Sequence, residues 1–130
     1  MKSVLAKTIA LSVLLGICGV AAADTTVRVV YICKVNDGKS MDDVRAANSA
    51  WSKYVNATVE GGAITSTILT PMVGDLSEGR FIYADDFPNV ESWSASNDAT
   101  SDSEEGRAIQ AALDAAGTCA SNSLYSAELS

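Results

Sequence analysis

The chain has 130 residues, of which 48% are hydrophobic and 19% are charged. This composition is ordinary for one globular domain with a modest core, and it excludes a disordered chain. Sixteen acidic residues outnumber nine basic ones, no histidine is present, and the net charge at pH 7 is −7. Nucleic-acid and anionic-membrane partners are excluded because both need clusters of Lys or Arg, and catalysis by Ser-His-Asp or Cys-His sets is excluded because both need histidine.

The first 23 residues have the pattern of a secretory signal peptide. Lys2 and Lys7 are followed by an uncharged run over 8–20 and by three alanines at 21–23. The apolar run is too short to span a bilayer, although a retained membrane anchor is the alternative. We expect cleavage to leave a single periplasmic or secreted domain over 24–130, with 130 − 23 = 107 residues and a net charge of 7 − 16 = −9.

The first strand and helix of this domain have the clearest patterns. Residues 27–35 are rich in β-branched and aromatic side chains and end at an Asn-Asp-Gly turn, which predicts a strand. Ser40 then begins an acidic capping box, and apolar residues recur at spacings of three and four, which predicts a helix over 41–57.

The rest of the chain alternates apolar segments with turn residues. We expect strands at 64–73, 80–85 and 119–128, helices at 90–95 and 104–116, and a polar loop at 96–103. The resulting order, β-α-β-β-α-β, predicts an α+β ferredoxin-like fold. Right-handed crossovers give an antiparallel four-stranded sheet in the order 4-1-3-2 with the helices on one face.

The cysteines are consistent with this topology. Cys18 leaves with the signal peptide, so Cys33 and Cys119 remain in an oxidising compartment. In the predicted order they meet at one edge of two neighbouring antiparallel strands, where opposed Cα atoms are about 4.5 to 5.5 Å apart, within the range of a disulfide. The alternative, a reactive redox pair, lacks the Cys-x-x-Cys spacing.

Apolar side chains occupy both faces of the predicted sheet. The first strand has Val27 and Val29 on one face and Val30 and Ile32 on the other, and residues 80–85 also alternate between two apolar sets. One small domain cannot easily cover both faces, so a partner sheet is expected. Element order and these two strands make the chain resemble the dimeric α/β-barrel superfamily over its whole mature length. The resemblance implies a homodimer, often with a pocket between helices and sheet, in a superfamily that includes monooxygenases, isomerases and haem-dependent enzymes.

Polar and aromatic residues in such a pocket are the best site candidates. They are Asn48, Trp51, Tyr54, Tyr83, Asp85 and Trp93. The alternative is that the aromatic residues are core anchors, since an aromatic stripe at helical spacing normally packs inside. Asp85 and Asp86 would share a site only where the strand has ended, because neighbours on a strand point to opposite faces.

Four acidic residues lie in or beside the predicted loop at 96–103: Asp98, Asp102, Glu104 and Glu105. A weak Ca²⁺ site is one interpretation, but the spacing matches no EF-hand. The other is a solvated loop whose carboxylates favour the start of the next helix. No metal or cofactor is assigned.

Three functions are compatible with the sequence. The first is an exported homodimer that binds a small apolar or aromatic molecule, with no reaction assigned. The second is a cofactor-independent monooxygenase or isomerase that uses Asn48, Trp51 and Asp85. The third is a structural or protein-interaction module without a small-molecule pocket.

Overall fold

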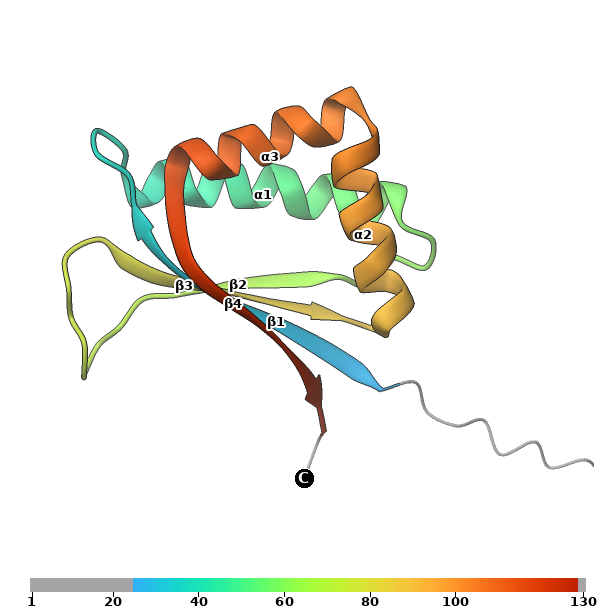
Figure 1. Cartoon of the computed structure of the whole chain (residues 1–130), viewed down its shortest axis with the longest axis horizontal. Coiled ribbons are helices and arrows are strands. Elements are labelled where there is room, and N and C mark those ends of the chain that lie inside the picture. The colour runs from blue at the N-terminus through green and yellow to red at the C-terminus, as the bar shows by residue number, and fades with distance from the viewer. Residues whose placement is uncertain (1–24, 129–130) are drawn as a thin grey trace, which may run out of the picture.

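A single antiparallel sheet carries three helices on one of its faces (Figure 1). The computed structural model describes residues 25–128, so the predicted signal peptide lies outside the described residues. The elements in chain order are β1 (Thr26–Val35), α1 (Met41–Thr58), β2 (Thr65–Leu69), β3 (Arg80–Phe87), α2 (Val90–Asp102), α3 (Glu104–Ala116) and β4 (Gly117–Ala127). The strand order is β2-β3-β1-β4, which confirms the predicted ferredoxin-like topology.

The helices begin at side-chain caps that are visible in the sequence. Ser40 and Asp43 form a reciprocal capping box at α1, in which the Ser40 backbone N–H donates to the Asp43 carboxylate at 2.8 Å. Asn89 accepts from the backbone N–H of Ser92 at the start of α2, at 2.8 Å. Such caps satisfy backbone donors that lack partners inside the helix.

The predicted loop at 96–103 is wrong, because α2 continues to Asp102. Its serines and threonines suggested a loop, but Ser96 is 2% exposed, and Thr100 donates its hydroxyl to the Ser96 carbonyl at 2.8 Å. Ser103 then caps α3 by accepting from the Gly106 backbone N–H at 2.8 Å. Hydroxyl side chains that bond within the helix are compatible with helical structure, and a cap can end one helix and begin the next.

Three strand boundaries differ from prediction by two residues or more, and one of them is the start of β4, at Gly117 instead of residue 119. β2 ends at Leu69, and Met72 and Val73 are 89% and 85% exposed in the loop that follows Pro71. β3 extends past residue 85 to Phe87, because its last residues still pair with β1.

The main core lies between the sheet and α1. Val44 and Val55 of α1 are completely buried, and they pack with sheet residues such as Val29 and Phe81 in two adjoining clusters. Burial of each such side chain stabilises the fold by roughly 1.5–3 kcal/mol. The face that bears Val29 and Phe81 is therefore the covered face of the sheet.

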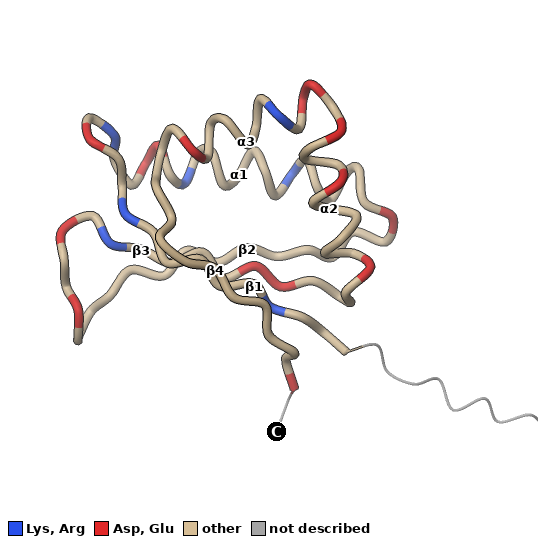
Figure 2. Tube along the Cα trace, in the orientation of Figure 1, with Lys and Arg blue, Asp and Glu red and all other residues tan. Residues whose placement is uncertain are grey.

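The opposite face, which we call the open face, bears no helix (Figure 1). The strand registers place Val30, Ile32, Leu69 and Ile82 together on it. The two edge strands, β2 and β4, contain no charged residue (Figure 2). Exposed sheet edges commonly carry charges that prevent pairing with another chain, and these edges lack them.

A disulfide joins Cys33 to Cys119, as predicted. The two residues are opposed in the β1–β4 register, and their Cα atoms are 3.9 Å apart, closer than the expected 4.5 to 5.5 Å. A register shift between Ile32 and Cys33 lies directly beside the pair. Among residues 25–128, no helix has the length and apolar character needed to cross a membrane.

Candidate functional site

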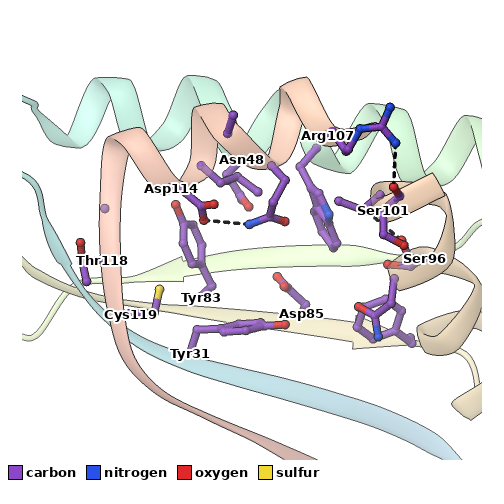
Figure 3. A pocket seen from close by; sticks show the side chains of 18 residues that line it. Tyr31, Asn48, Tyr83, Asp85, Ser96, Ser101, Arg107, Asp114, Thr118 and Cys119 are labelled. Carbon is purple, nitrogen blue, oxygen red and sulfur yellow. Dashed lines mark hydrogen bonds between the residues drawn. The ribbon is translucent and has the colours of Figure 1, made fainter. Parts of the chain in front are cut away.

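A cavity of about 780 Å³ lies on the covered face, between the sheet and the helices (Figure 3). Its wall combines β1 and β3 of the sheet with parts of α1, α2 and α3 and the start of β4. α3 runs into β4 without a loop, so the disulfide at Cys119 is part of the same wall. The volume is typical of sites for small molecules.

Four aromatic side chains line the cavity. Tyr31 and Tyr83 are directly opposed on β1 and β3. Trp51 reaches the cavity from α1 and packs edge-on against Phe87, with ring centroids 6.4 Å apart and planes at 81°. These rings offer flat apolar surfaces of the kind that bind aromatic molecules.

One hydrogen-bonded row of polar side chains crosses from helix to sheet. Asn48 of α1 donates from Nδ2 to the Ser66 hydroxyl oxygen at 3.0 Å, and Ser66 donates its hydroxyl to Oδ1 of Asp85. The Ser66 hydroxyl has a single proton, so donation to Asp85 excludes donation to the Asn48 carbonyl oxygen 3.1 Å away. The hydrogen bonds of this row therefore run from Asn48 to Ser66 and from Ser66 to Asp85, and Asp85 is the final acceptor.

Asp85 is a buried carboxyl group without a cationic partner. Asp85 is 6% exposed, and it takes part in none of the ion pairs found within the described residues 25–128. Arg107, which also lines the cavity, donates to the Ser101 carbonyl at 3.0 Å. Burial raises the pKa of Asp85 from 3.8 to about 6, the Ser66 hydrogen bond partly opposes this shift, and the charge of Asp86 adds to it. The group therefore changes its protonation state near neutral pH.

The Tyr83 hydroxyl is also unusual. Its residue is 8% exposed, and its oxygen is the one buried side-chain polar atom in the described part of the chain without a hydrogen-bond partner. Burial, and then the charge of Asp85, raise the pKa of Tyr83 to about 12. The same two causes raise the pKa of Tyr31. Both hydroxyls are therefore protonated donors at neutral pH.

Four of the six predicted pocket residues line this cavity: Asn48, Trp51, Tyr83 and Asp85. Tyr54 does not, because its hydroxyl donates to the Ala99 carbonyl at 2.7 Å and lies 2.6 Å from the Ser103 hydroxyl, where α1 meets α2. Trp93 is half-buried against the main core, outside the cavity lining. Tyr54 and Trp93 therefore lie where they would be expected if the aromatic residues are core anchors. The roles of the other four residues remain predictions.

Several cavity residues were not among the predicted candidates. Ser66 does not line the cavity itself, but it hydrogen-bonds to the lining residue Asp85, and this contact follows from their direct pairing across β2 and β3. Tyr31 lines the cavity from the same face of β1 as Val27 and Val29. Arg107, Gln110 and Asp114 lie on a helix whose sequence pattern indicated only an apolar side.

The acidic residues considered for Ca²⁺ lie in helices. Asp98 and Asp102 belong to α2, and Glu104 and Glu105 form the first turn of α3, where carboxylates stabilise a helix start (Figure 2). Within the described residues, no group of three or more Asp, Glu, Cys or His side chains is arranged to hold a metal ion.

Comparison by sequence shows no matching protein-family model and no matching curated protein. Comparison by structure shows SnoaB, a cofactor-independent oxygenase from Streptomyces nogalater, at 14% identity and a TM-score of 0.59, covering 82% of this chain and 96% of that chain. A protein of unknown function from Bacteroides thetaiotaomicron, described as a possible oxidoreductase, has 10% identity and a TM-score of 0.55, covering 80% and 99%. A dimeric ferredoxin-like protein of unknown function from Thermobifida fusca has 17% identity and a TM-score of 0.50, covering 82% and 92%.

At these identities the likeness shows the fold alone. It agrees with the resemblance to dimeric α/β-barrel proteins that element order and strand composition indicate. The chain has the fold of the dimeric ferredoxin-like and SnoaB-type α+β proteins.

Proposed function

We propose that the protein binds a small aromatic molecule in the cavity between the sheet and α1, α2 and α3. The observation that carries the proposal is Asp85, a buried and unpaired carboxyl group in the wall of an aromatic-lined cavity. Such a group lowers the stability of the folded chain when it is ionised, and a buried group with a shifted pKa in a cavity wall is typical of a binding or catalytic site. The rings of Trp51 and Phe87 contact the flat faces of the ligand, and Asp85 accepts a hydrogen bond from it.

The two tryptophans provide a matched test with 2-naphthol as the probe. Trp51 lines the cavity and Trp93 does not, although both pack against the same core cluster. In calorimetric titrations, Trp51→Ala is expected to weaken binding of 2-naphthol about tenfold, since it removes a large contact surface. Trp93→Ala is expected to leave the affinity within about twofold while circular dichroism confirms that both variants fold. Equal losses in the two variants would contradict the proposed site.

A second candidate function is cofactor-independent oxygenation of the bound molecule. The pKa of about 6 suits Asp85 as a general base at neutral pH, and Asn48 and Ser66 hold its carboxylate through the hydrogen-bonded row. Asp85 would take a proton from a C–H group of the ligand, and dissolved dioxygen would add to the resulting carbanion to form a C–O bond. Return of the proton from Asp85 would give a hydroperoxide, and loss of water would leave a carbonyl group on the ligand. The likeness of fold to SnoaB, an oxygenase without a cofactor, adds support. The test is oxygen consumption with a hydroxylated aromatic compound: Asp85→Asn abolishes turnover if this function is right, and unchanged turnover refutes it.

The quaternary structure proposed for the protein is a homodimer formed through the open face. Val30, Ile32, Leu69 and Ile82 form an apolar set there, and the neighbouring β2 and β4 edges are uncharged. The similar Thermobifida fusca protein is dimeric. Light scattering is expected to give the mass of two chains, and Ile82→Asp is expected to give one. A wild-type monomer would refute this arrangement.

The proposed location is the periplasm or the exterior of the cell, after removal of residues 1–23. The Cys33–Cys119 disulfide is consistent with an oxidising compartment. The test is mass spectrometry of the protein recovered from its native host, in which the chain begins at Asp24. A full-length chain starting at Met1 would refute cleavage.

A further inference from the structure

The Tyr83 hydroxyl group makes no hydrogen bond with any other group in the described part of the chain. The residue lines the cavity (Figure 3) and is 8% exposed, and its Oη atom is buried. Its ring is held edge-on against Phe81, with centroids 4.9 Å apart and planes at 84°. Buried polar groups nearly always have partners, and an unpaired one destabilises the folded state.

Tyr83 and Asp85 both line the cavity from the covered face of the sheet, which forms the floor of the cavity. They are two residues apart on β3 and pair with Tyr31 and Val29 of β1 on the covered face. Two residues of a strand span roughly 7 Å, which is within the length of a bicyclic aromatic molecule. The floor therefore offers an unpaired donor and, two strand positions away, a carboxyl group that accepts one hydrogen bond from Ser66 and can accept more.

The charge around Tyr83 restricts the kind of acceptor that fits. When Asp85 is ionised it repels an anionic ligand oxygen, and Asp114 places a second carboxylate in the cavity wall. Asp114 already accepts a hydrogen bond from Gln110 at 2.9 Å. Arg107 is the one basic residue among the lining residues, and its Nη1 atom already donates to the Ser101 carbonyl. A neutral carbonyl oxygen accepts a hydrogen bond without this electrostatic cost.

We propose that the Tyr83 hydroxyl recognises a neutral carbonyl oxygen on the aromatic ligand and so makes the cavity selective for aromatic ketones over hydrocarbons and carboxylates. This inference rests on the proposed binding function and names the class of ligand. Tyr83 is then the residue that sets specificity, while Trp51 and Phe87 supply contact area that does not distinguish a ketone from a hydrocarbon.

The experiment compares 2-acetonaphthone with 2-ethylnaphthalene, which has a methylene group where the ketone has its carbonyl. Both are titrated calorimetrically at pH 8 into the disulfide-bonded wild type, Tyr83→Phe and Tyr31→Phe. Tyr83→Phe is expected to weaken binding of the ketone about fivefold to tenfold and to leave the hydrocarbon within about twofold, as loss of one hydrogen bond requires. Tyr31→Phe is the matched control, because it removes the opposed hydroxyl of the same floor, and it is expected to leave the ratio of the two affinities unchanged.

The outcomes separate this inference from the proposed function. If both probes bind and Tyr83→Phe leaves their ratio unchanged, or if Tyr31→Phe alone changes it, the role of Tyr83 is refuted and the binding site stands. If neither probe binds the wild type while 2-naphthol does, the selectivity for ketones is refuted and the binding site stands; if 2-naphthol also fails to bind, the binding function itself is refuted. With 2-naphthoate as a third probe, binding to the wild type as tight as that of the ketone would refute the requirement for a neutral acceptor.

Discussion

Asp85 and Asp86 are neighbours on β3, yet their surroundings differ because successive strand residues face opposite sides of the sheet. On the open face, Asp86 forms a two-pronged ion pair with Arg28, with N–O distances of 2.7 and 2.9 Å. On the covered face, Asp85 is buried in the cavity wall and receives one hydroxyl donor from Ser66. One residue of strand alternation thus separates a solvated, charge-paired carboxylate from a buried, unpaired one.

The difference identifies which carboxyl group is a candidate for function. The pKa of Asp85 is about 6 in the folded chain, against an ordinary value of 3.8. Ionisation of Asp85 at neutral pH therefore lowers the stability of the folded chain by about 2–3 kcal/mol. The Asp86 pair, which is partly exposed, is a common surface feature and needs no ligand to explain it.

The largest expected effect concerns the covalent link beside the cavity. Cys33 and Cys119 are 86 residues apart in sequence, so their bond strongly restricts the unfolded chain. Reduction is expected to lower the free energy of unfolding by about 4 kcal/mol, measured by urea denaturation with and without reductant. The double variant Cys33→Ala, Cys119→Ala is the control and should not respond to reductant. A wild type whose stability is unaffected by reduction would contradict this expectation.

The next effect tests the burial of Asp85. Its pKa is raised in the folded state, so its contribution to stability is present below about pH 4 and is lost as pH rises through about 6. Asp85→Asn cannot ionise and keeps an acceptor for Ser66. It is therefore expected to exceed the wild type by about 2–3 kcal/mol at pH 8 and to match it near pH 4.

Urea denaturation over this pH range measures the difference between the two proteins. Asp43 and Asp75, whose pKa values are lowered by hydrogen bonds from serines, are common to both and cancel in the comparison. A stability difference that does not change with pH would contradict an unpaired, buried Asp85.

The smallest effect is expected on the open face. Asp86→Asn removes the charge that pairs with Arg28 in a solvent-accessible position. The loss of stability in the monomeric Ile82→Asp background should be well below the Asp85→Asn change and should shrink in high salt, because salt screens exposed pairs. A loss comparable with the Asp85 effect would show that the two carboxylates are not as different as their burial indicates.

Much of the fold was predictable because its signals are local. The Asn-Asp-Gly turn, the Ser40 cap and the strand alternation specify their elements within a few residues, and topology then brings Cys33 and Cys119 together. The helix through 96–102 was missed because its serines and threonines satisfy themselves within the helix, which composition does not reveal.

The site was predictable only in part. Trp51 and Tyr54 are one helical turn apart and indistinguishable by pattern, yet one faces the cavity and the other bonds to α2. Ser66 reaches Asp85 through the β2–β3 register, which depends on where a long connecting loop closes. The separation of Asp85 from Asp86 follows from strand alternation, but it needed the strand to continue to Phe87.

The most direct test of the account is a ¹³C NMR titration of the Asp85 side-chain carboxyl carbon, assigned by its loss in Asp85→Asn. A buried carboxyl group without a cationic partner is expected to titrate with a midpoint near pH 6, well above that of an ordinary aspartate. A midpoint near pH 4 would mean that the carboxylate is solvated or paired, and it would contradict the buried, unpaired group on which the proposed site depends.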